Sequence, residues 1–282
     1  MAKRYDNPEA FKQALLVRLR SAATSRALSL QDMQIKLLIE RLLARLFADP
    51  NAPWLLKGGF AMELRYRPKA RTTRDIDLTA TTNTGMIEMR ELLQAVAELD
   101  LGDHLEFRIG SFRRELPGAP GGGARFPVEA LLAGKIFGRF HIDVGIGDHV
   151  SGQPELLIGE DLLGFAGIEP ARALAIPKAQ QFAEKLHAYT YAWDDRENTR
   201  VKDIVDLVLL IERGELDPDE VAVAIRETFT RRNTHGVPSK LTVPPTSWAS
   251  EFPSLARQAE LTTPELDEAF EILTKYFNRL KL

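Results

Sequence analysis

The spacing of apolar residues divides the chain into a helical start, a mixed middle and a helical end. Residues 8–48 are rich in Leu, Arg, Ala and Gln at helical spacing and predict two helices, with Ser29 as the N-cap of the second. Residues 54–147 alternate between strand-like and helical segments. From Pro177 onward the pattern is mainly helical, apart from residues 236–253. These patterns predict an α+β fold joined to a helical region.

Two segments of the middle part alternate strictly between polar and apolar residues. In Asp75-Ile76-Asp77-Leu78 both carboxylates lie on one face of a strand, while Ile76 and Leu78 enter the core. Carboxylates spaced by roughly 7 Å of strand suit a hard cation such as Mg²⁺. In residues 140–147 the same alternation places Asp143 opposite the apolar face. Asp143 is either an ordinary exposed strand residue or the third carboxylate of a triad for metal-assisted phosphoryl transfer.

A glycine turn precedes the first of these strands. Lys57-Gly58-Gly59 follows the apolar run Trp54-Leu55-Leu56 and leads into residues 60–64, which read as the start of a helix. Glycines at such a turn let backbone amides and the helix N-terminus approach a phosphate. Either motif alone is more simply a helix-entry turn or a pair of surface carboxylates. Their order and separation together favour nucleotidyl transfer.

The helical half contributes a second group of charged residues. Lys185 lies on a helix beside an apolar face. Asp203 and Asp206 lie on a segment, residues 201–210, that is otherwise almost entirely apolar. A buried carboxylate is costly unless it is paired, so a salt bridge to a nearby cation is expected. This pattern is consistent with three readings: a structural salt bridge, a solvated lysine, or an Asp206 that orients a functional Lys185.

A basic segment lies between the glycine turn and the Asp75 strand. It carries Arg65, Arg67, Lys69, Arg71 and Arg74 without a single acidic residue. A solvated loop is the usual explanation of such a run. Its position beside the expected phosphate site favours contact with a triphosphate or with the end of an RNA.

Composition narrows the class of protein. The chain has 282 residues with 44% hydrophobic content, enough for a substantial core and most simply for two domains. It lacks cysteine, which excludes disulfides, thiol catalysis and Cys-based zinc sites, and its five histidines are scattered. A net charge of −3 argues against a protein that coats nucleic acid, although a local basic surface is compatible with it. With neither an apolar stretch of membrane-spanning length nor an N-terminal signal core, a cytoplasmic protein without a membrane segment is expected.

At four places in succession the chain resembles a known family. These are the Lys57-Gly58-Gly59 turn, the segment Arg71-Thr72-Thr73-Arg74-Asp75-Ile76-Asp77, residues 181–188 (QFAEKLHA) and residues 200–207 (RVKDIVDL). In this order they are similar to the motifs of AbiEii-type nucleotidyltransferase toxins. Those are the toxin halves of type IV toxin–antitoxin and abortive-infection systems, within the polymerase-beta-like nucleotidyltransferase superfamily. The resemblance covers about residues 50–210, and the C-terminal quarter matches no motif of the family.

The resemblance implies a fold and an activity. It implies a polymerase-beta-like nucleotidyltransferase domain with a mixed sheet and N-terminal helices over residues 1–168. A mainly helical domain over residues 169–282 would close the cleft. The activity would be metal-dependent transfer of NMP from an NTP to an RNA acceptor, the 3′ end of tRNA, with release of pyrophosphate and growth arrest. A separately encoded antitoxin is the expected protein partner.

The residue patterns and the resemblance together assign roles to residues. Asp75, Asp77 and Asp143 would hold Mg²⁺ or Mn²⁺, and Asp143 would also help to activate the acceptor. Gly58 and Gly59 would cradle phosphate, with Lys57 and Thr73 in support. Lys185 would hold the triphosphate as a compact charge, and Asp206 would orient Lys185. The residues predicted to act in catalysis are therefore Asp75, Asp77, Asp143, Lys185 and Asp206.

Two other functions are compatible with the same residues. The first is a nucleotidyltransferase that modifies a protein or small-molecule hydroxyl, because three carboxylates serve any acceptor. The second is an RNA- or protein-binding module that kept the fold without turnover. Label transferred to protein or a small molecule would favour the first, and RNA binding without NTP consumption would favour the second.

Overall fold

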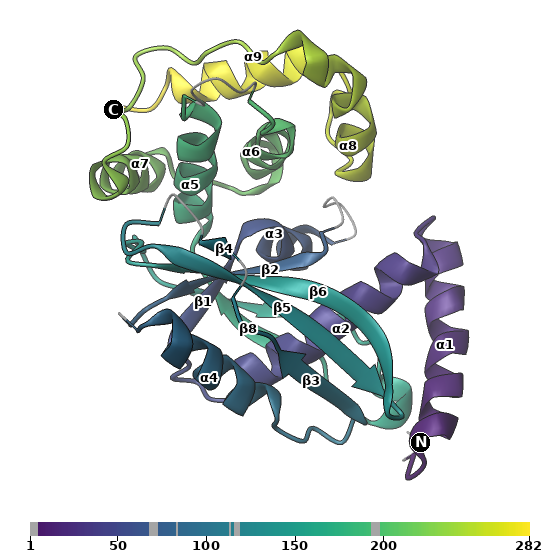
Figure 1. The fold of residues 1–282 in the computed structure, drawn as a ribbon. Helices are drawn as coiled ribbons and strands as arrows, with labels where there is room; N and C mark the ends of the chain where they lie inside the picture. The colour runs from purple at the N-terminus through teal and green to yellow at the C-terminus, as the bar shows by residue number, and fades with distance from the viewer. Residues whose placement is uncertain (1–4, 68–72, 83, 113, 116–118, 193–197) are drawn as a thin grey trace. The chain divides into compact units, whose positions relative to one another are not determined.

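The chain forms two compact units. The computed structural model describes all residues except 1–4, 68–72, 83, 113, 116–118 and 193–197 (Figure 1). Unit 1 comprises Met1–Leu56, Thr73–Gly147 and Leu156–Ala175, and unit 2 comprises Lys57–Thr72, Asp148–Glu155 and Ile176–Leu282. The chain thus passes from unit 1 to unit 2 for the last time after Ala175. The predicted domain boundary after residue 168 stays a prediction.

Unit 1 is built on a mixed sheet with strand order β3-β5-β6-β2-β1-β8-β7, and β4 pairs with β5. Strands β2 and β6 run parallel, as do β1 and β8, whereas β5 is antiparallel to β3, β4 and β6. Helices and strands in one sheet-based unit confirm the predicted α+β class. The elements are α1 Pro8–Ser25, α2 Leu30–Leu46, β1 Trp54–Lys57, β2 Asp75–Ala80, α4 Met86–Ala97, β3 Leu105–Ile109, β4 Arg114–Glu115, β5 Gly123–Leu132, β6 Lys135–Ile146, β7 Glu155–Ile158, η1 Gly164–Ala166 and β8 Arg172–Ala175.

The two predicted N-terminal helices are present as α1 and α2. The Ser29 side chain accepts a hydrogen bond of 3.0 Å from the Asp32 amide, which confirms Ser29 as the N-cap of α2. Helix α2 contacts α4, and both pack against the sheet (Figure 1). Leu38, Ile39 and Leu42 on α2 are fully buried. Burial of this apolar surface, rather than helix propensity, holds α2 on the sheet.

Charged residues of α2 are buried together with one carboxylate. Asp103 is 0% exposed, and its oxygens accept hydrogen bonds from Arg41 Nε at 2.8 Å and Arg45 Nη2 at 2.7 Å. Arg41 also donates to the Glu169 carbonyl and Arg45 to the Leu105 carbonyl. Burial alone would raise the pKa of Asp103, but the Arg45 hydrogen bond and the charges of both guanidiniums lower it overall. Asp103 is therefore ionised and fixes α2 to the start of β3.

Unit 2 is helical, as predicted for the C-terminal part of the chain. Its elements are α3 Gly58–Tyr66, α5 Lys178–Thr190, α6 Val201–Arg213, α7 Pro218–Arg232, η2 Thr246–Ser250, α8 Phe252–Gln258 and α9 Leu266–Phe277. Helix α6 is central: it contacts α3, α5, α8 and α9, and Ile204, Leu207 and Val208 on it are 0% exposed. Among the described residues of both units, no helix combines the length and apolarity needed to cross a membrane.

Candidate active site

Strand β2 presents two carboxylates on one face, as the sequence pattern predicts. Ile76 and Leu78 are 0% exposed, whereas the Asp75 side chain is 42% exposed. Residues two apart on a strand share a face, so Asp75 and Asp77 point to the same side of the sheet. The alternation of the sequence has a direct cause: the apolar positions fill the core of unit 1, and the acidic positions stay outside it.

Strand β6 brings Asp143 beside this pair. The parallel register aligns Asp77 with Asp143 and Asp75 with His141. Neighbouring strands lie roughly 5 Å apart, and residues opposite one another share a face. Asp75, Asp77 and Asp143 therefore lie together on one face, as predicted. We call them the carboxylate row. His141 adds an imidazole whose Nδ1 lies 3.7 Å from Asp75 Oδ1.

Arg125, which sequence reasoning missed, completes the row on the far side of Asp143. It lies on β5 directly opposite Asp143. Its Nε donates to Asp143 Oδ1 at 2.7 Å and its Nη2 to Oδ2 at 2.6 Å, so both carboxylate oxygens are engaged. The hydrogen bond with Asp143 raises the pKa of Arg125, against a lowering by burial, and the charges of Asp75 and Asp77 raise it further. The guanidinium thus responds to all three carboxylates.

A β-bulge creates the pairing of Arg125 with Asp143. Next to the turn, Leu131 pairs with Ile136, but the next residue of β5, Ala130, pairs with Gly138. Phe137 is therefore the extra residue of β6. If Phe137 were paired within the ladder, the uninterrupted register would place Ala124 opposite Asp143 instead of Arg125. Bulges of this kind re-aim side chains beside functional sites. The alternation of residues reveals the face on which Arg125 lies, but gives no sign of the bulge.

The carboxylates of Asp75, Asp77 and Asp143 suit a divalent cation, although Asp143 is already paired with Arg125. Carboxylate oxygens are what Mg²⁺ and Mn²⁺ prefer, and Asp75 and Asp77 offer them from adjacent positions on one face. Within the described part of the chain, no three Asp, Glu or His side chains are already gathered as a metal-binding group. The bidentate contact of Arg125 with Asp143 is consistent with that. The role of Asp75, Asp77 and Asp143 as metal ligands stays a prediction.

In unit 2 the glycine turn opens a helix, as predicted. Lys57 ends β1, and α3 begins at Gly58, whose φ of 65° lies in the left-handed region that glycine adopts without strain. The Gly58 carbonyl accepts a hydrogen bond of 2.6 Å from Gln181 Nε2 on α5. Lys57, at the N-cap position of α3, makes no side-chain hydrogen bond to the first turn. Amides at such an uncapped N-terminus are suited to an anion.

Lys57 itself belongs to a partly buried four-charge cluster with Asp148, Glu184 and Arg232. Its Nζ lies 2.7 Å from Asp148 Oδ2 and 3.3 Å from Glu184 Oε2. Arg232 contacts the same two carboxylates at 3.0 and 3.3 Å. Burial lowers the pKa of Lys57, but the charges of Glu184 and Asp148 outweigh it and raise the value overall. The cluster fixes the residue before the glycine turn, and a phosphate contact by Lys57 stays a prediction.

Lys185 and Asp206 are in direct contact, as the helical pattern predicts. Lys185 Nζ, on α5, donates to Asp206 Oδ2 at 2.6 Å and to Asp203 Oδ1 at 3.1 Å, both on α6. The Lys185 side chain is 9% exposed and that of Asp206 1%. Two carboxylates on one lysine hold its ammonium in a single position. The contact therefore fits both an orienting role for Asp206 and a purely structural salt bridge.

The basic segment is not one continuous surface. Arg65 lies within α3, and its side chain is 4% exposed and bonded to Glu155, Gln181 and the Ile176 carbonyl. Residues 68–72, which include Lys69 and Arg71, lie outside the described residues. Arg74 is exposed and pairs with Asp32 at 2.7 Å. Arg65 is thus bonded within unit 2 rather than solvated, and contact of the basic segment with a triphosphate or an RNA end stays a prediction. Thr73, half-buried before β2, keeps its supporting role as a prediction.

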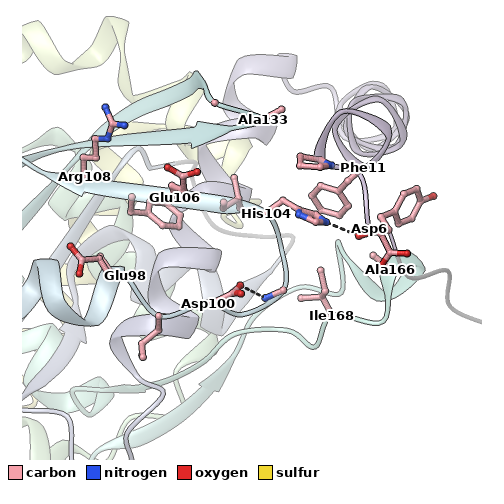
Figure 2. A pocket seen from close by; sticks show the side chains of 18 of the residues that line it. Asp6, Phe11, Glu98, Asp100, His104, Glu106, Arg108, Ala133, Ala166 and Ile168 are labelled. Carbon is pink, nitrogen blue, oxygen red and sulfur yellow. Dashed lines mark hydrogen bonds between the residues drawn. The ribbon is translucent and has the colours of Figure 1, made fainter.

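A cavity of ≈ 790 Å³ lies elsewhere on unit 1 (Figure 2). It is lined by the start of α1, the end of α4 and β3, with Phe11, His104 and Arg108 among its side chains. Its lining carries acidic side chains, such as Glu98 and Glu106, as well as the basic Arg108 (Figure 2). None of the three carboxylates of the row is among its described lining residues. The candidate active site is therefore not this cavity.

Comparison with known proteins agrees with this geometry. The chain matches the family model of the nucleotidyl transferase AbiEii toxin of type IV toxin–antitoxin systems over residues 41–280, well past the motifs that end near residue 210. No curated protein sequence is significantly similar to it. It is similar in structure to MenT4, a nucleotidyltransferase toxin from Mycobacterium tuberculosis H37Rv, at 16% identity and a TM-score of 0.63, covering 93% of this chain and 88% of that one. The chain belongs to the AbiEii family of nucleotidyltransferase toxins of type IV toxin–antitoxin systems.

Proposed function

We propose that this nucleotidyltransferase transfers NMP from an NTP to the 3′ end of tRNA, and that growth arrest follows from the modified tRNA. The observation that carries the proposal is the register of β2 and β6, which aligns Asp77 with Asp143 and places Asp75 on the same face. Family membership supports a nucleotidyl transfer reaction and a toxin. The acceptor is inferred from the chemistry of the family and needs its own test.

In the proposed reaction the acceptor hydroxyl oxygen forms a bond to the α-phosphorus of the NTP. The bond between the α-phosphorus and the bridging oxygen breaks, and pyrophosphate leaves. Asp75, Asp77 and Asp143 would hold Mg²⁺ or Mn²⁺, which when bound supplies charge neutralisation for the attacking and leaving oxygens. Asp143 would also accept the proton of the acceptor hydroxyl.

The residues of unit 2 would bind the nucleotide. The amides of Gly58 and Gly59 at the start of α3 would cradle phosphate, with Lys57 and Thr73 in support. Lys185 would hold the triphosphate, with Asp206 and Asp203 keeping its ammonium in place. A cognate antitoxin is the expected protein partner, and the cytoplasm is the expected location.

The acceptor can be identified by following label from each α-labelled NTP. The protein is incubated with Mg²⁺ and total RNA, purified tRNA, or tRNA whose terminal ribose has been oxidised with periodate. We expect label on intact tRNA and none on the oxidised form, because oxidation destroys the 3′ hydroxyl. Label on protein or a small molecule would instead identify the alternative acceptor. RNA binding without NTP consumption would identify a binding module and contradict the proposal.

The contact between Lys185 and Asp206 gives a second expected result. Replacing Lys185 by Ala should raise the KM for NTP by roughly 10- to 100-fold, the range of a hydrogen bond to a charged group. Adding Asp206→Asn should cost much less than its effect in the wild-type background, because the two residues act as a unit. Steady-state kinetics of the four proteins measures this coupling.

Lys202 is an exposed lysine on the same helix as Asp206, so Lys202→Ala is the matched control and should leave the KM for NTP unchanged. Circular dichroism must first show that each variant is folded, since Lys185→Ala removes a cation from two buried carboxylates, Asp203 and Asp206. Fully additive losses would show that Lys185 and Asp206 work separately.

A further inference from the structure

Arg125 occupies a position that the proposed reaction does not explain. It lies on the strand next to β6, in the same cross-strand line as Asp143 and Asp77. Its side chain is 36% exposed, and that of Asp143 is 14% exposed. The guanidinium contacts both Asp143 oxygens in the bidentate geometry that is the strongest form of this interaction. A residue expected to bind a cation is thus already bound by one from the protein itself.

We propose that Arg125 is a resident counter-cation of the carboxylate row, which holds Asp143 while no divalent cation is bound and competes with that cation for Asp143. The inference rests on the proposed role of Asp75, Asp77 and Asp143 as metal ligands. Arg125 acts through Asp143 and is therefore a positioning residue, which sets how tightly the metal is held.

Electrostatics explains why such a residue is useful. Three carboxylates on adjacent positions of one face repel one another, which opposes folding when no cation is present. A guanidinium beside them offsets that repulsion. The same guanidinium repels a second cation at the same oxygens, so binding of a metal at Asp143 requires Arg125 to withdraw. The bulge at Phe137 supports this reading, because leaving Phe137 out of the ladder places Arg125 rather than Ala124 opposite Asp143.

The sheet contains a matched control for this ion pair. Arg139 and Glu129 face one another across the same two strands, and Arg139 Nε donates to Glu129 Oε1 at 2.8 Å. Arg139 lies before the stretch of β6 that pairs with β2, which begins at His141. Arg139→Ala therefore removes the same charge and the same kind of contact from the same strand pair, but away from the carboxylate row.

Binding of Mn²⁺ to the nucleotide-free protein, measured by titration calorimetry and by electron paramagnetic resonance, tests the proposal without any turnover. We expect Arg125→Ala to bind Mn²⁺ on the order of tenfold more tightly than wild type, within the range usual for coupled sites. Arg125→Lys keeps the charge but not the planar guanidinium that contacts both Asp143 oxygens, and should tighten Mn²⁺ binding less. Without metal, Arg125→Ala should unfold at a lower temperature than Arg139→Ala, and saturating Mn²⁺ should remove most of that difference.

Each contrary outcome has a separate meaning. Unchanged or weaker Mn²⁺ binding by Arg125→Ala, together with loss of binding in Asp77→Asn, would overturn the competition and leave the metal site standing. If Arg139→Ala tightened Mn²⁺ binding equally, the proposed competition would also be overturned, because the effect would then follow from the net charge of the protein alone. If Asp77→Asn binds Mn²⁺ like wild type, the proposed metal site fails and the inference fails with it. Should Arg125→Ala not fold, Arg125→Lys decides: unchanged affinity would overturn the proposal.

Discussion

A protein carrying Asp77→Asn will lose nucleotidyl transfer and toxicity while keeping its fold. The substitution preserves the shape of a side chain that lies outside the core, and removes the charge that would bind a divalent cation. A bound metal supplies several kcal/mol of transition-state stabilisation, so we expect a loss of roughly 10³-fold or more in rate. Asp75→Asn should behave in the same way. Transfer of label from NTP and growth of cells expressing each variant measure the two effects.

Glu129→Gln provides the control for Asp77→Asn. It makes the same carboxylate-to-amide change on an exposed position of the same sheet, and should leave both activity and toxicity near wild type. Near-normal transfer by the folded double variant of Asp75 and Asp77 would end the proposal that these carboxylates carry the chemistry.

Replacing Asp103 by Ala will have the largest effect on stability. Arg41 and Arg45 would then be left buried without their anion, and removal of one partner from a buried ion pair typically costs about 3–5 kcal/mol. Urea unfolding measures the free energy of unfolding directly. Because the pKa of Asp103 is lowered in the folded protein, its contribution is present above the ordinary value of 3.8 and is lost as the pH falls below it.

Asp100→Ala is the matched control for Asp103→Ala. Asp100 lies three residues earlier in the same loop, is exposed, and accepts a local hydrogen bond from the Gly102 amide. Its replacement should cost less than about 1 kcal/mol. A similar small loss for Asp103→Ala would show that the two arginines are satisfied without this carboxylate.

Features encoded by local pattern could be predicted from the sequence. The alternation around Asp77 and Asp143 fixed the face of each strand, and Ser29 marked the start of α2, because each depends on the period of an element or on a single cap. The contact of Lys185 with Asp206 followed from the cost of burying an unpaired carboxylate. The order of four motifs identified the family.

Features that depend on register or on distant segments could not be predicted in the same way. Arg125 meets Asp143 because Phe137 is left out of the ladder between β5 and β6, and the alternation gives no sign of this. Arg65 looks like part of a basic loop, yet it lies in a helix and pairs with Glu155, a residue far away in sequence. Both cases are decided by tertiary pairing of residues that have no fixed spacing along the chain.

The backbone ladder between β2 and β6 also limits how this protein can change during evolution. The hydrogen bonds that align Asp77 with Asp143 admit whole-residue steps only, and a one-residue slip would bring Ile142 or Val144 to that position and turn the acid to the opposite face. Insertions and deletions should therefore accumulate in the connections between the strands and be excluded from the paired stretches. Loop lengths can diverge widely among descendants of this sequence, while the spacing from Asp75 to Asp77 stays at two residues.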